Sequence, residues 1–424
     1  MTHHPTISSP AALQCRICGQ QYPVEPLTVC EECFGPLEPS YELQSVDGVD
    51  FRKQAEAGPQ TLWRYESLLP GGPGIERVDL GAGFTPLRHA GNLAKALGHD
   101  GVIWVKDDSV NPSNSFKDRV VSVATTMARA FGYESISCAS TGNLANATAA
   151  HAAKAGMDCY VFVPEDLERA KILATECYGA KVVAVKGNYD DVNRLCSEVA
   201  EALPWAFVNV NMRPYYAEGS KSLGFETAEQ LGWRLPDHVV VPIASGALLT
   251  KIHRAFGELI AVGAVEEKPY RVSGAQPEGC RPVAQAFGDG AEEVTPVKPD
   301  TIARSLAIGA PADGYFALKV ARETGGHIEW CTEQEIREGI SLLASTEGVF
   351  TETAGGVTIA NLKRMVDKGI VKPGEEVVAY VTGNGYKTIE ALEGFLEPSF
   401  NVAPDLDEFL AALARSEAGA VTVP

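Results

Sequence analysis

A lysine at position 117 stands where a turn-like segment gives way to the pattern of a helix. The segment from Asn111 to Arg119 has the sequence NPSNSFKDR, and the apolar spacing that follows predicts a helix closed by Gly132. The positive end of a helix dipole disfavours an ammonium ion, and a neutral lysine amine is the nucleophile that forms imines with aldehydes. On this segment alone, a solvated lysine on a helix surface explains Lys117 better than a catalytic group does.

Two further segments place small or polar residues between a strand and a helix. Ser140–Asn143, with the sequence STGN, offers hydroxyl, backbone N–H and amide groups that suit a carboxylate or phosphate. The alternative is a helix that is simply capped by Asn143. Pro242–Leu249, with the sequence PIASGALL, would let backbone amides approach a phosphate closely, but it lacks the Lys-Ser/Thr ending of a nucleotide-binding P-loop.

Together the three segments predict a cofactor. They supply one candidate imine lysine and two helix starts that could accept anions, while the histidines show no spacing for a catalytic metal. This combination indicates a phosphate-bearing aldehyde, pyridoxal phosphate.

Four cysteines near the N-terminus form two Cys-x-x-Cys pairs separated by eleven residues: Cys15, Cys18, Cys30 and Cys33. Each pair can place two thiolates on one ion, so the spacing predicts a structural zinc site. The alternative is a module that has kept its thiols without a metal. The other six cysteines are scattered singly in apolar stretches and are expected to be inert thiols.

The elements that must position these residues follow an α/β pattern. From about residue 100, helical stretches alternate with short strands that are apolar on both faces, which is typical of parallel sheets covered by helices. Two α/β lobes with a ligand cleft between them are expected, and the polar segment Gly288–Thr301 could move as a lid. The expected strands lie in 102–108, 135–140, 159–164, 180–187, 205–210, 238–245, 270–276 and 376–383.

The composition excludes several classes of function. The chain has 424 residues and a formal net charge of −19, which argues against a nucleic-acid partner. No apolar run approaches the roughly 20 residues needed to cross a bilayer, and the first residues do not resemble a signal peptide. We therefore expect a cytoplasmic protein with no membrane partner.

Seven motifs, in their order along the chain, carry a family resemblance. They are GFTPL (83–87), NPSNSFKDR, STGN, GNYDDV (187–192), PIASGALL, SLAIGAPADG (305–314) and TETAGG (351–356). From Leu13 to Leu392 the chain resembles the zinc-ribbon-bearing branch of the threonine synthase family, within the tryptophan-synthase-β-like (fold type II) pyridoxal phosphate enzymes.

The resemblance implies a two-lobed fold type II architecture with a small N-terminal zinc ribbon. The implied divisions are a zinc-ribbon-like module (12–40), a large cofactor-binding domain (41–115 and 216–400), a small α/β domain (116–215) and a C-terminal extension (401–424). A homodimer is also implied.

The resemblance further implies roles for single residues. Lys117 would form the imine with the cofactor beside Phe116, Asn143 would bind the cofactor's 3-oxygen, and Thr382 would face its pyridine nitrogen. Backbone amides would hold the cofactor phosphate at Ala244, Ser245, Gly246, Ala247 and Leu248. The implied substrate contacts are Ser140, Thr141, Asn188, Arg194 and Lys221.

The implied reaction converts O-phospho-L-homoserine, a small amino-acid substrate, and water to L-threonine and phosphate. Asn114 stands where relatives commonly have Gly or His, and Leu144 where many have Thr, so we expect Asn114 to influence substrate choice. Two alternatives follow: a related β- or γ-replacement enzyme or dehydratase for another activated amino acid, and an inactive scaffold that binds partners through the cysteine module.

Overall fold

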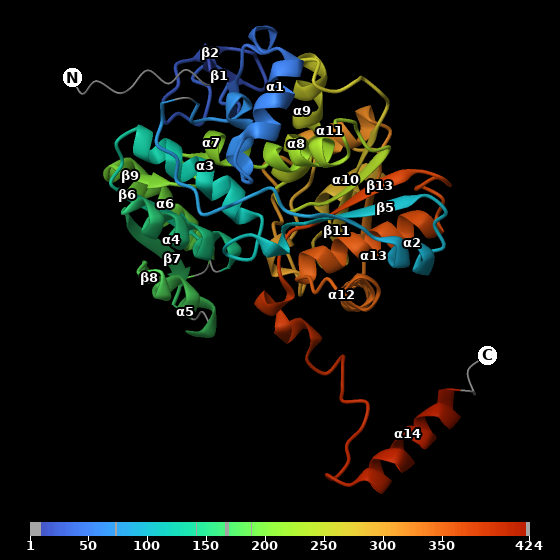
Figure 1. The fold of residues 1–424 in the computed structure, drawn as a ribbon. Helices are drawn as coiled ribbons and strands as arrows, with labels where there is room; N and C mark the ends of the chain where they lie inside the picture. The colour runs from blue at the N-terminus through green and yellow to red at the C-terminus, as the bar shows by residue number, and fades with distance from the viewer. Residues whose placement is uncertain (1–9, 73, 141, 166–168, 188, 421–424) are drawn as a thin grey trace.

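The computed structural model describes residues 10–72, 74–140, 142–165, 169–187 and 189–420. Within this part of the chain the strands form three sheets, two of them covered by helices (Figure 1). The α/β class that the sequence predicts is confirmed.

The larger sheet has six strands in the order β12-β11-β10-β13-β5-β4. Its strands are β4 (Leu87–His89), β5 (Val102–Asp107), β10 (His238–Pro242), β11 (Arg271–Pro277), β12 (Ile328–Cys331) and β13 (Glu376–Val381). All neighbours are parallel except β4 and β5. Successive residues of β10 enter different cores, since Val239 packs on one face and Val240 on the other. This two-sided burial explains the continuous apolar runs.

The smaller sheet has four parallel strands in the order β8-β7-β6-β9. They are β6 (Ser135–Ala139), β7 (Asp158–Pro164), β8 (Lys181–Val185) and β9 (Trp205–Phe207). The last is shorter than the apolar run 205–210 suggests. The Phe207 N–H donates to Asn211 Oδ1 at 2.7 Å and Val210 N–H donates back to Phe207 O, so the chain turns there.

Helices connect and cover the strands. They are α1 (Gly48–Ala57), α2 (Gly91–Ala96), α3 (Lys117–Ala130), α4 (Asn143–Ala155), α5 (Arg169–Cys177), α6 (Tyr189–Ala202), α7 (Arg213–Glu218), α8 (Lys221–Gln230), α9 (Ala247–Ala261), α10 (Pro282–Gly288), α11 (Gly314–Glu323), α12 (Glu333–Glu347), α13 (Thr353–Asp367) and α14 (Leu406–Ala420). Short 3-10 turns lie at Leu43–Ser45, Leu62–Leu68, Asp108–Val110, Glu278–Cys280, Arg304–Leu306, Gly385–Lys387 and Ile389–Leu392. As expected, α3 begins at Lys117.

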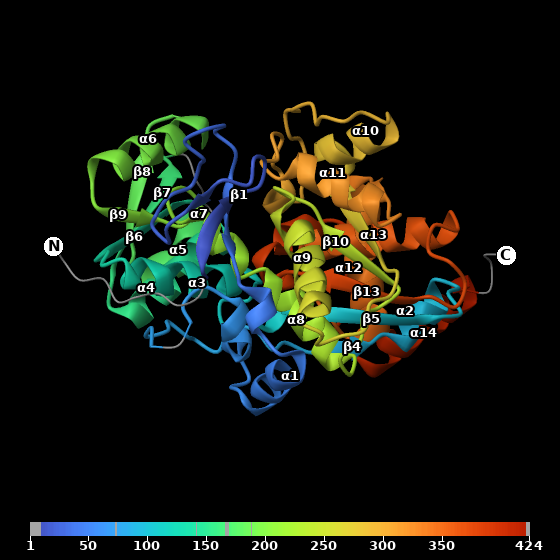
Figure 2. The ribbon, with the colours of Figure 1, turned by 90° about the horizontal axis from the view of Figure 1, so that it is seen from above.

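The N-terminal module, residues 12–40, is a small antiparallel sheet of its own. It contains β1 (Ala12–Cys15), β2 (Gln21–Tyr22) and β3 (Leu37–Ser40). Leu13 and Leu37 join the same apolar core as side chains of α3 and α4. Figure 2 shows β1 between the green lobe that carries the smaller sheet and the orange helix α11. The module therefore contacts both halves of the molecule.

Two peripheral segments complete the chain. Helix α14 stands away from the rest of the molecule (Figure 1). The backbone bonds that anchor Gly288–Thr301 include Val297 N–H to Gly309 O and Asp300 N–H to Gly279 O. Its movement as a lid stays a prediction, as do the domain boundaries. Among the described residues, no helix is long and apolar enough to cross a membrane.

Candidate active site

The carboxyl ends of three neighbouring parallel strands bring the predicted cofactor residues together. In the larger sheet β10, β13 and β5 are adjacent. Ala244–Leu248 follows β10, Thr382 follows β13, and the segment Asn111–Lys117 follows β5. Open α/β sheets bind ligands at this edge.

Backbone hydrogen bonds join the loop before Lys117 to the loop after β13. Phe116 N–H donates to Thr382 O at 2.9 Å, and Asn384 N–H donates to Asn114 O at 3.1 Å. Asn114 has a φ of 64°, a left-handed conformation that glycine and asparagine adopt most readily. Backbone geometry is thus sufficient to explain an asparagine at position 114.

Lys117 is the first residue of α3. Its Nζ donates to Tyr216 Oη on α7 at 2.9 Å and lies 4.4 Å from the centre of the Phe116 ring. These two contacts restrict the position of the amine. No sequence motif pointed to Tyr216, which lies 99 positions away along the chain.

Asn143 connects the smaller sheet to the larger one. Gly142, not Asn143, is the N-cap of α4, so the interpretation of Asn143 as a simple helix cap is wrong. Its Nδ2 instead donates to Glu352 Oε2 at 2.9 Å. Glu352 precedes α13, and its own N–H donates to Gly383 O, next to Thr382.

Glu352 is the buried carboxyl group of the site. It is only 2% exposed, and Gly383 approaches it so closely that a Cβ there would lie 2.5 Å from the carboxyl carbon. Burial raises the pKa of Glu352, although hydrogen bonds from Asn143 and Thr382 and the charges of Lys387 and Lys117 oppose the shift. The same carboxyl group therefore touches the residues expected at the cofactor's 3-oxygen and at its pyridine nitrogen.

Lys387 adds a second ammonium group beside Glu352. Burial lowers the pKa of Lys387, against the attraction of Glu352 and Asp118. Glu352 and Lys387 lie within TETAGG and the segment 382–387, TGNGYK, and sequence reasoning assigned neither a role.

The segment Ala244–Leu248 presents backbone rather than side chains. Gly246 is the N-cap of the 15-residue helix α9, has a φ of 93° and has no side chain of its own, while the Ala247 N–H donates a long hydrogen bond of 3.4 Å to Ser245 Oγ. A Cβ at this position would lie 2.7 Å from the carbonyl oxygen of Asp313. Glycine is required here, and the first N–H groups of α9 can receive an anion.

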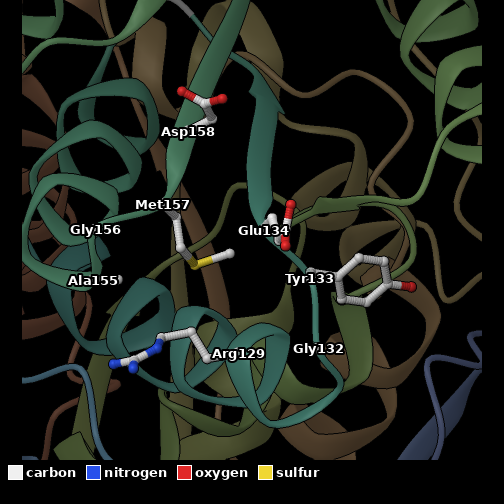
Figure 3. A pocket seen from close by; sticks show the side chains of 8 residues that line it. All are labelled: Arg129, Gly132, Tyr133, Glu134, Ala155, Gly156, Met157 and Asp158. Atoms are coloured by element: carbon white, nitrogen blue, oxygen red, sulfur yellow. The ribbon is translucent and has the colours of Figure 1, made fainter. Parts of the chain in front are cut away.

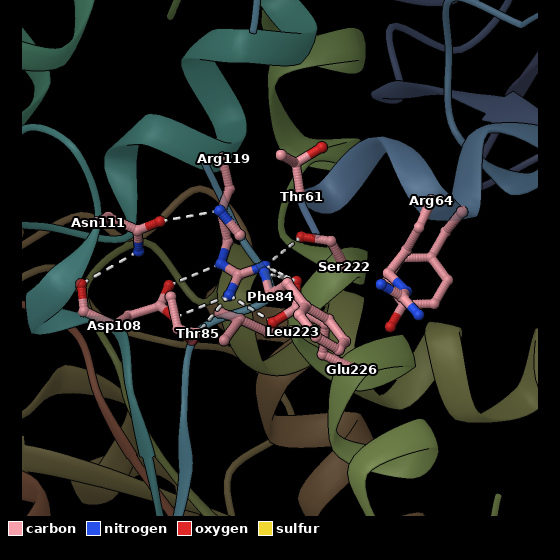
Figure 4. Close-up of polar contacts among 12 residues, drawn as sticks. Thr61, Arg64, Phe84, Thr85, Asp108, Asn111, Arg119, Ser222, Leu223 and Glu226 are labelled. Carbon is pink, nitrogen blue, oxygen red and sulfur yellow. Dashed lines mark hydrogen bonds and ion pairs between the residues drawn. The ribbon is translucent and has the colours of Figure 1, made fainter. Parts of the chain in front are cut away.

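A buried ionic network fixes the start of α3. The Arg119 guanidinium, fully buried, donates to Asp108 at 2.7 and 2.8 Å and to Glu226 at 2.5 and 2.7 Å, as Figure 4 shows. It also reaches Ser222 Oγ and Thr85 Oγ1. Because Arg119 lies two residues after Lys117, this network holds the lysine's helix turn against α8 and the 3-10 turn that follows β5.

Comparisons with known proteins agree with this arrangement. Residues 78–383 match the family described as pyridoxal-phosphate dependent enzyme. The chain is 35% identical to threonine synthase of Methanocaldococcus jannaschii, over 93% of this chain and 97% of the relative. It is 34% identical to threonine synthase of Methanosarcina acetivorans, over 95% and 98%. The chain belongs to the threonine synthase family of pyridoxal-phosphate dependent enzymes.

A solved structure shows the same fold at greater distance. Diaminopropionate ammonia lyase from Escherichia coli matches with a TM-score of 0.63 and 18% identity, covering 82% of this chain and 91% of the other. The fold type II architecture is thereby confirmed.

The structure does not bring together the residues that the family resemblance implies as substrate contacts as clearly as it does the cofactor residues. Ser140 is half-buried, and its Oγ lies 3.4 Å from the N–H of Gly142. Thr141 and Asn188 lie outside the described residues. Arg194 is exposed on α6, where it pairs with Asp191 and Glu198 of the same helix.

Lys221 requires a correction. Its Nζ is fully buried and pairs with Glu218 at 2.7 Å and with Glu258 at 2.8 Å. Two carboxylates already neutralise the ammonium, so Lys221 is a structural charge between α7, α8 and α9 rather than a substrate-phosphate contact.

The four cysteines of the N-terminal module converge as their spacing predicts. All four sulfur atoms lie within 4.8 Å of one another, and Cys15–Cys33, Cys18–Cys33 and Cys18–Cys30 are 3.5, 3.5 and 3.6 Å apart. In a tetrahedral site with Zn–S distances of about 2.3 Å, the sulfur atoms lie slightly farther apart than the sulfur atoms of these three pairs do. The donor set thus fits a zinc ion after a small expansion.

A surface pocket lies away from the candidate active site. Figure 3 shows Arg129, Gly132, Tyr133, Glu134, Ala155, Gly156, Met157 and Asp158 around it. It sits where β6 and β7 begin, at the opposite end of the smaller sheet from Ser140 and Asn143. We therefore place the candidate active site at the carboxyl ends of the strands and not in this pocket.

Proposed function

We propose that this protein is a threonine synthase, a carbon–oxygen lyase that converts O-phospho-L-homoserine and water to L-threonine and phosphate. Membership of the family over nearly the whole chain supports the proposal. The observation that carries it is that Asn143 bonds the buried carboxyl group of Glu352, which interacts with Thr382, while the residue before Lys117 bonds the backbone of Thr382.

The residues present fit pyridoxal phosphate. Lys117 would hold it covalently through Nζ, with the Phe116 ring beside it and the Asn143 amide on its 3-oxygen. The amides of Ala244–Leu248 would bind its phosphate, as the φ of Gly246 and the open start of α9 allow. Thr382, 4% exposed, would offer its hydroxyl to the pyridine nitrogen. When bound, this cofactor withdraws electrons from the substrate's α-carbon.

The protein's own groups would then manage protons and orientation. Once the amine of the substrate has replaced that of Lys117 on the cofactor, the released Lys117 Nζ would remove the protons from Cα and Cβ of the substrate, and Tyr216 Oη, 2.9 Å away, would hold the amine toward those atoms. The γ-phosphate leaves with its bridging oxygen, the hydroxyl of water adds at Cβ, and Cγ and Cα receive protons. Ser140 and Thr141 would hold the substrate carboxylate or phosphate, and Asn188 and Arg194 its phosphate, which keeps the reacting carbons in place.

We further propose that the cysteine module binds one structural zinc ion, and that the protein acts as a cytoplasmic homodimer. The sulfur positions support the metal. The dimer and the compartment rest on the family resemblance and the sequence alone.

Product analysis tests the proposed reaction. The holoenzyme is incubated with O-phospho-L-homoserine, and phosphate and threonine are measured together, with O-phospho-L-serine and L-serine as competing substrates. We expect equal amounts of phosphate and threonine from O-phospho-L-homoserine, and loss of both in Lys117→Ala. Turnover of the serine compounds without threonine formation would contradict the proposal and favour the related β-replacement enzyme or dehydratase.

A further inference from the structure

Arg16 of the N-terminal module contacts the half of the molecule that carries the larger sheet. It lies within the first cysteine pair, directly after Cys15. Its Nη1 donates to Asp313 Oδ1 at 2.5 Å, and its guanidinium carbon lies 3.6 Å from the centre of the Phe316 ring. Phe316 belongs to α11, so one side chain of the module both stacks on that helix and pairs with the residue before it.

Asp313 in turn contacts the backbone expected to hold the cofactor phosphate. Its N–H donates to Ser245 O at 2.8 Å. Its carbonyl oxygen packs so closely on Gly246 that no Cβ fits between them. A displacement of Asp313 would therefore move the N-cap of α9, where the anion-binding amides begin.

The Asp313 carboxylate is held from two sides. Arg213 Nη2 donates to its other oxygen, Oδ2, at 2.9 Å. Arg213 lies on α7, three residues before Tyr216, the partner of Lys117. The side chains of Asp313 and Arg16 are only 7% and 14% exposed, so water competes weakly for this pair.

We propose that Arg16 is a positioning residue for the phosphate-binding loop. Through Asp313, Arg16 links the N-terminal module to Ser245 and Gly246. The module thereby stabilises the conformation in which these amides receive the cofactor phosphate. The inference rests on the proposed cofactor site. It gives the cysteine module a part in cofactor affinity that a purely structural zinc ribbon would not have.

Cofactor affinity measured by titration tests this role. Metal-replete apoprotein is titrated with pyridoxal phosphate, using the change in tryptophan fluorescence, for the wild type, Arg16→Met, Arg16→Lys, Asp313→Asn and the double variant Arg16→Met/Asp313→Asn. Zinc content and thermal unfolding are measured on each. Arg129→Met is the control, because that guanidinium pairs with the exposed Glu76, far from the loop.

We expect Arg16→Met and Asp313→Asn each to raise the dissociation constant about five- to tenfold, which lies within the range that coupling through packed contacts gives. The double variant should be no weaker than the weaker single variant, and Arg16→Lys should recover part of the affinity because it keeps the charge. Arg129→Met should bind like the wild type. At saturating cofactor, kcat of Arg16→Met should approach the wild-type value.

Unchanged affinity in a zinc-loaded Arg16→Met protein would overturn the proposal, and so would additive effects in the double variant. If Arg16→Met loses its zinc, Arg16→Gln takes its place under the same criteria. A wild-type protein that binds no pyridoxal phosphate would instead overturn the proposed cofactor site, so the two failures are distinguishable.

Discussion

At the scale of single residues, the backbone conformation of Asn114 accounts for the residue type at this position. It lies three residues before Lys117 and adopts a φ of 64°. Its carbonyl oxygen accepts the Asn384 N–H, while its side chain is exposed. These facts favour a conformational role over a direct influence on substrate choice.

Two substitutions separate these roles. Asn114→Gly should keep both stability and substrate preference, because glycine adopts this φ freely. Asn114→Ala should lower the free energy of unfolding by about 1–2 kcal/mol, since a Cβ without a compensating side chain is strained there. Urea denaturation and the ratio of kcat/KM for two substrates measure both effects. A changed preference in Asn114→Gly would show that the amide acts on substrate.

Three residues near Lys117 and Asn143 could not be predicted from the sequence, and the physical reason is the same for all three. Tyr216, Glu352 and Lys387 come from α7, the start of α13 and a loop after β13, and only the folded chain brings them to Lys117 and Asn143. Lys221 was assigned to the substrate because its segment resembles the family's substrate-phosphate contacts, and a sequence pattern does not show which carboxylates a lysine meets in the fold. In the structure, Glu218 and Glu258 bury it.

At the scale of elements, the strands were predictable where both faces are buried. Strands β5, β10 and β13 are long apolar runs at the centre of the larger sheet, and the sequence predicted all three. The edge strands β4 and β12 have only three and four residues, too few for a pattern to emerge. The Arg119 network fixes the start of α3 against α8 and the turn after β5, and the apolar pattern does not show this network.

The network makes a prediction about acid stability. Burial alone would raise the pKa of Glu226, but Arg119 and Lys106 lower it from 4.5 to about 2. A carboxyl group shifted in this way contributes about 3 kcal/mol to the free energy of unfolding above pH 4.5, and loses that contribution as the pH falls toward 2. Glu226→Gln should therefore be much less stable than the wild type at pH 7 and differ less from it at pH 3.

Chemical denaturation at the two pH values measures this difference. Glu76→Gln is the matched control, because Glu76 is exposed and pairs with Arg129 at the surface. It should change stability little at either pH. A deficit of Glu226→Gln that is the same at pH 7 and pH 3 would show that the carboxylate charge is not what stabilises the helix start.

At the scale of the whole molecule, the N-terminal module lies across the junction between the larger and the smaller sheet. Leu13 and Leu37 pack with α3 and α4, whereas Glu38 pairs with Lys251 and Arg254 of α9. The chain order would not reveal this placement, because the module precedes both sheets in sequence.

Loss of metal should therefore affect more than the module. We expect one zinc ion per chain, and we expect Cys18→Ser to lose it and to lower the Tm by several degrees, since the module then packs loosely on both sheets. Metal analysis and thermal unfolding measure these effects. Cys177→Ser, an exposed thiol outside the module, should keep its zinc and the wild-type Tm. Purified protein without zinc, with four freely reacting thiols, would contradict this prediction.

The most direct test of the central claim is the position of the covalent cofactor bond. The holoenzyme is treated with borohydride, which reduces an imine to a stable amine, and is then digested and analysed by mass spectrometry. We expect one phosphopyridoxyl group per chain, on Lys117. A modified Lys387 or any other lysine, or no modification at all, would contradict this expectation.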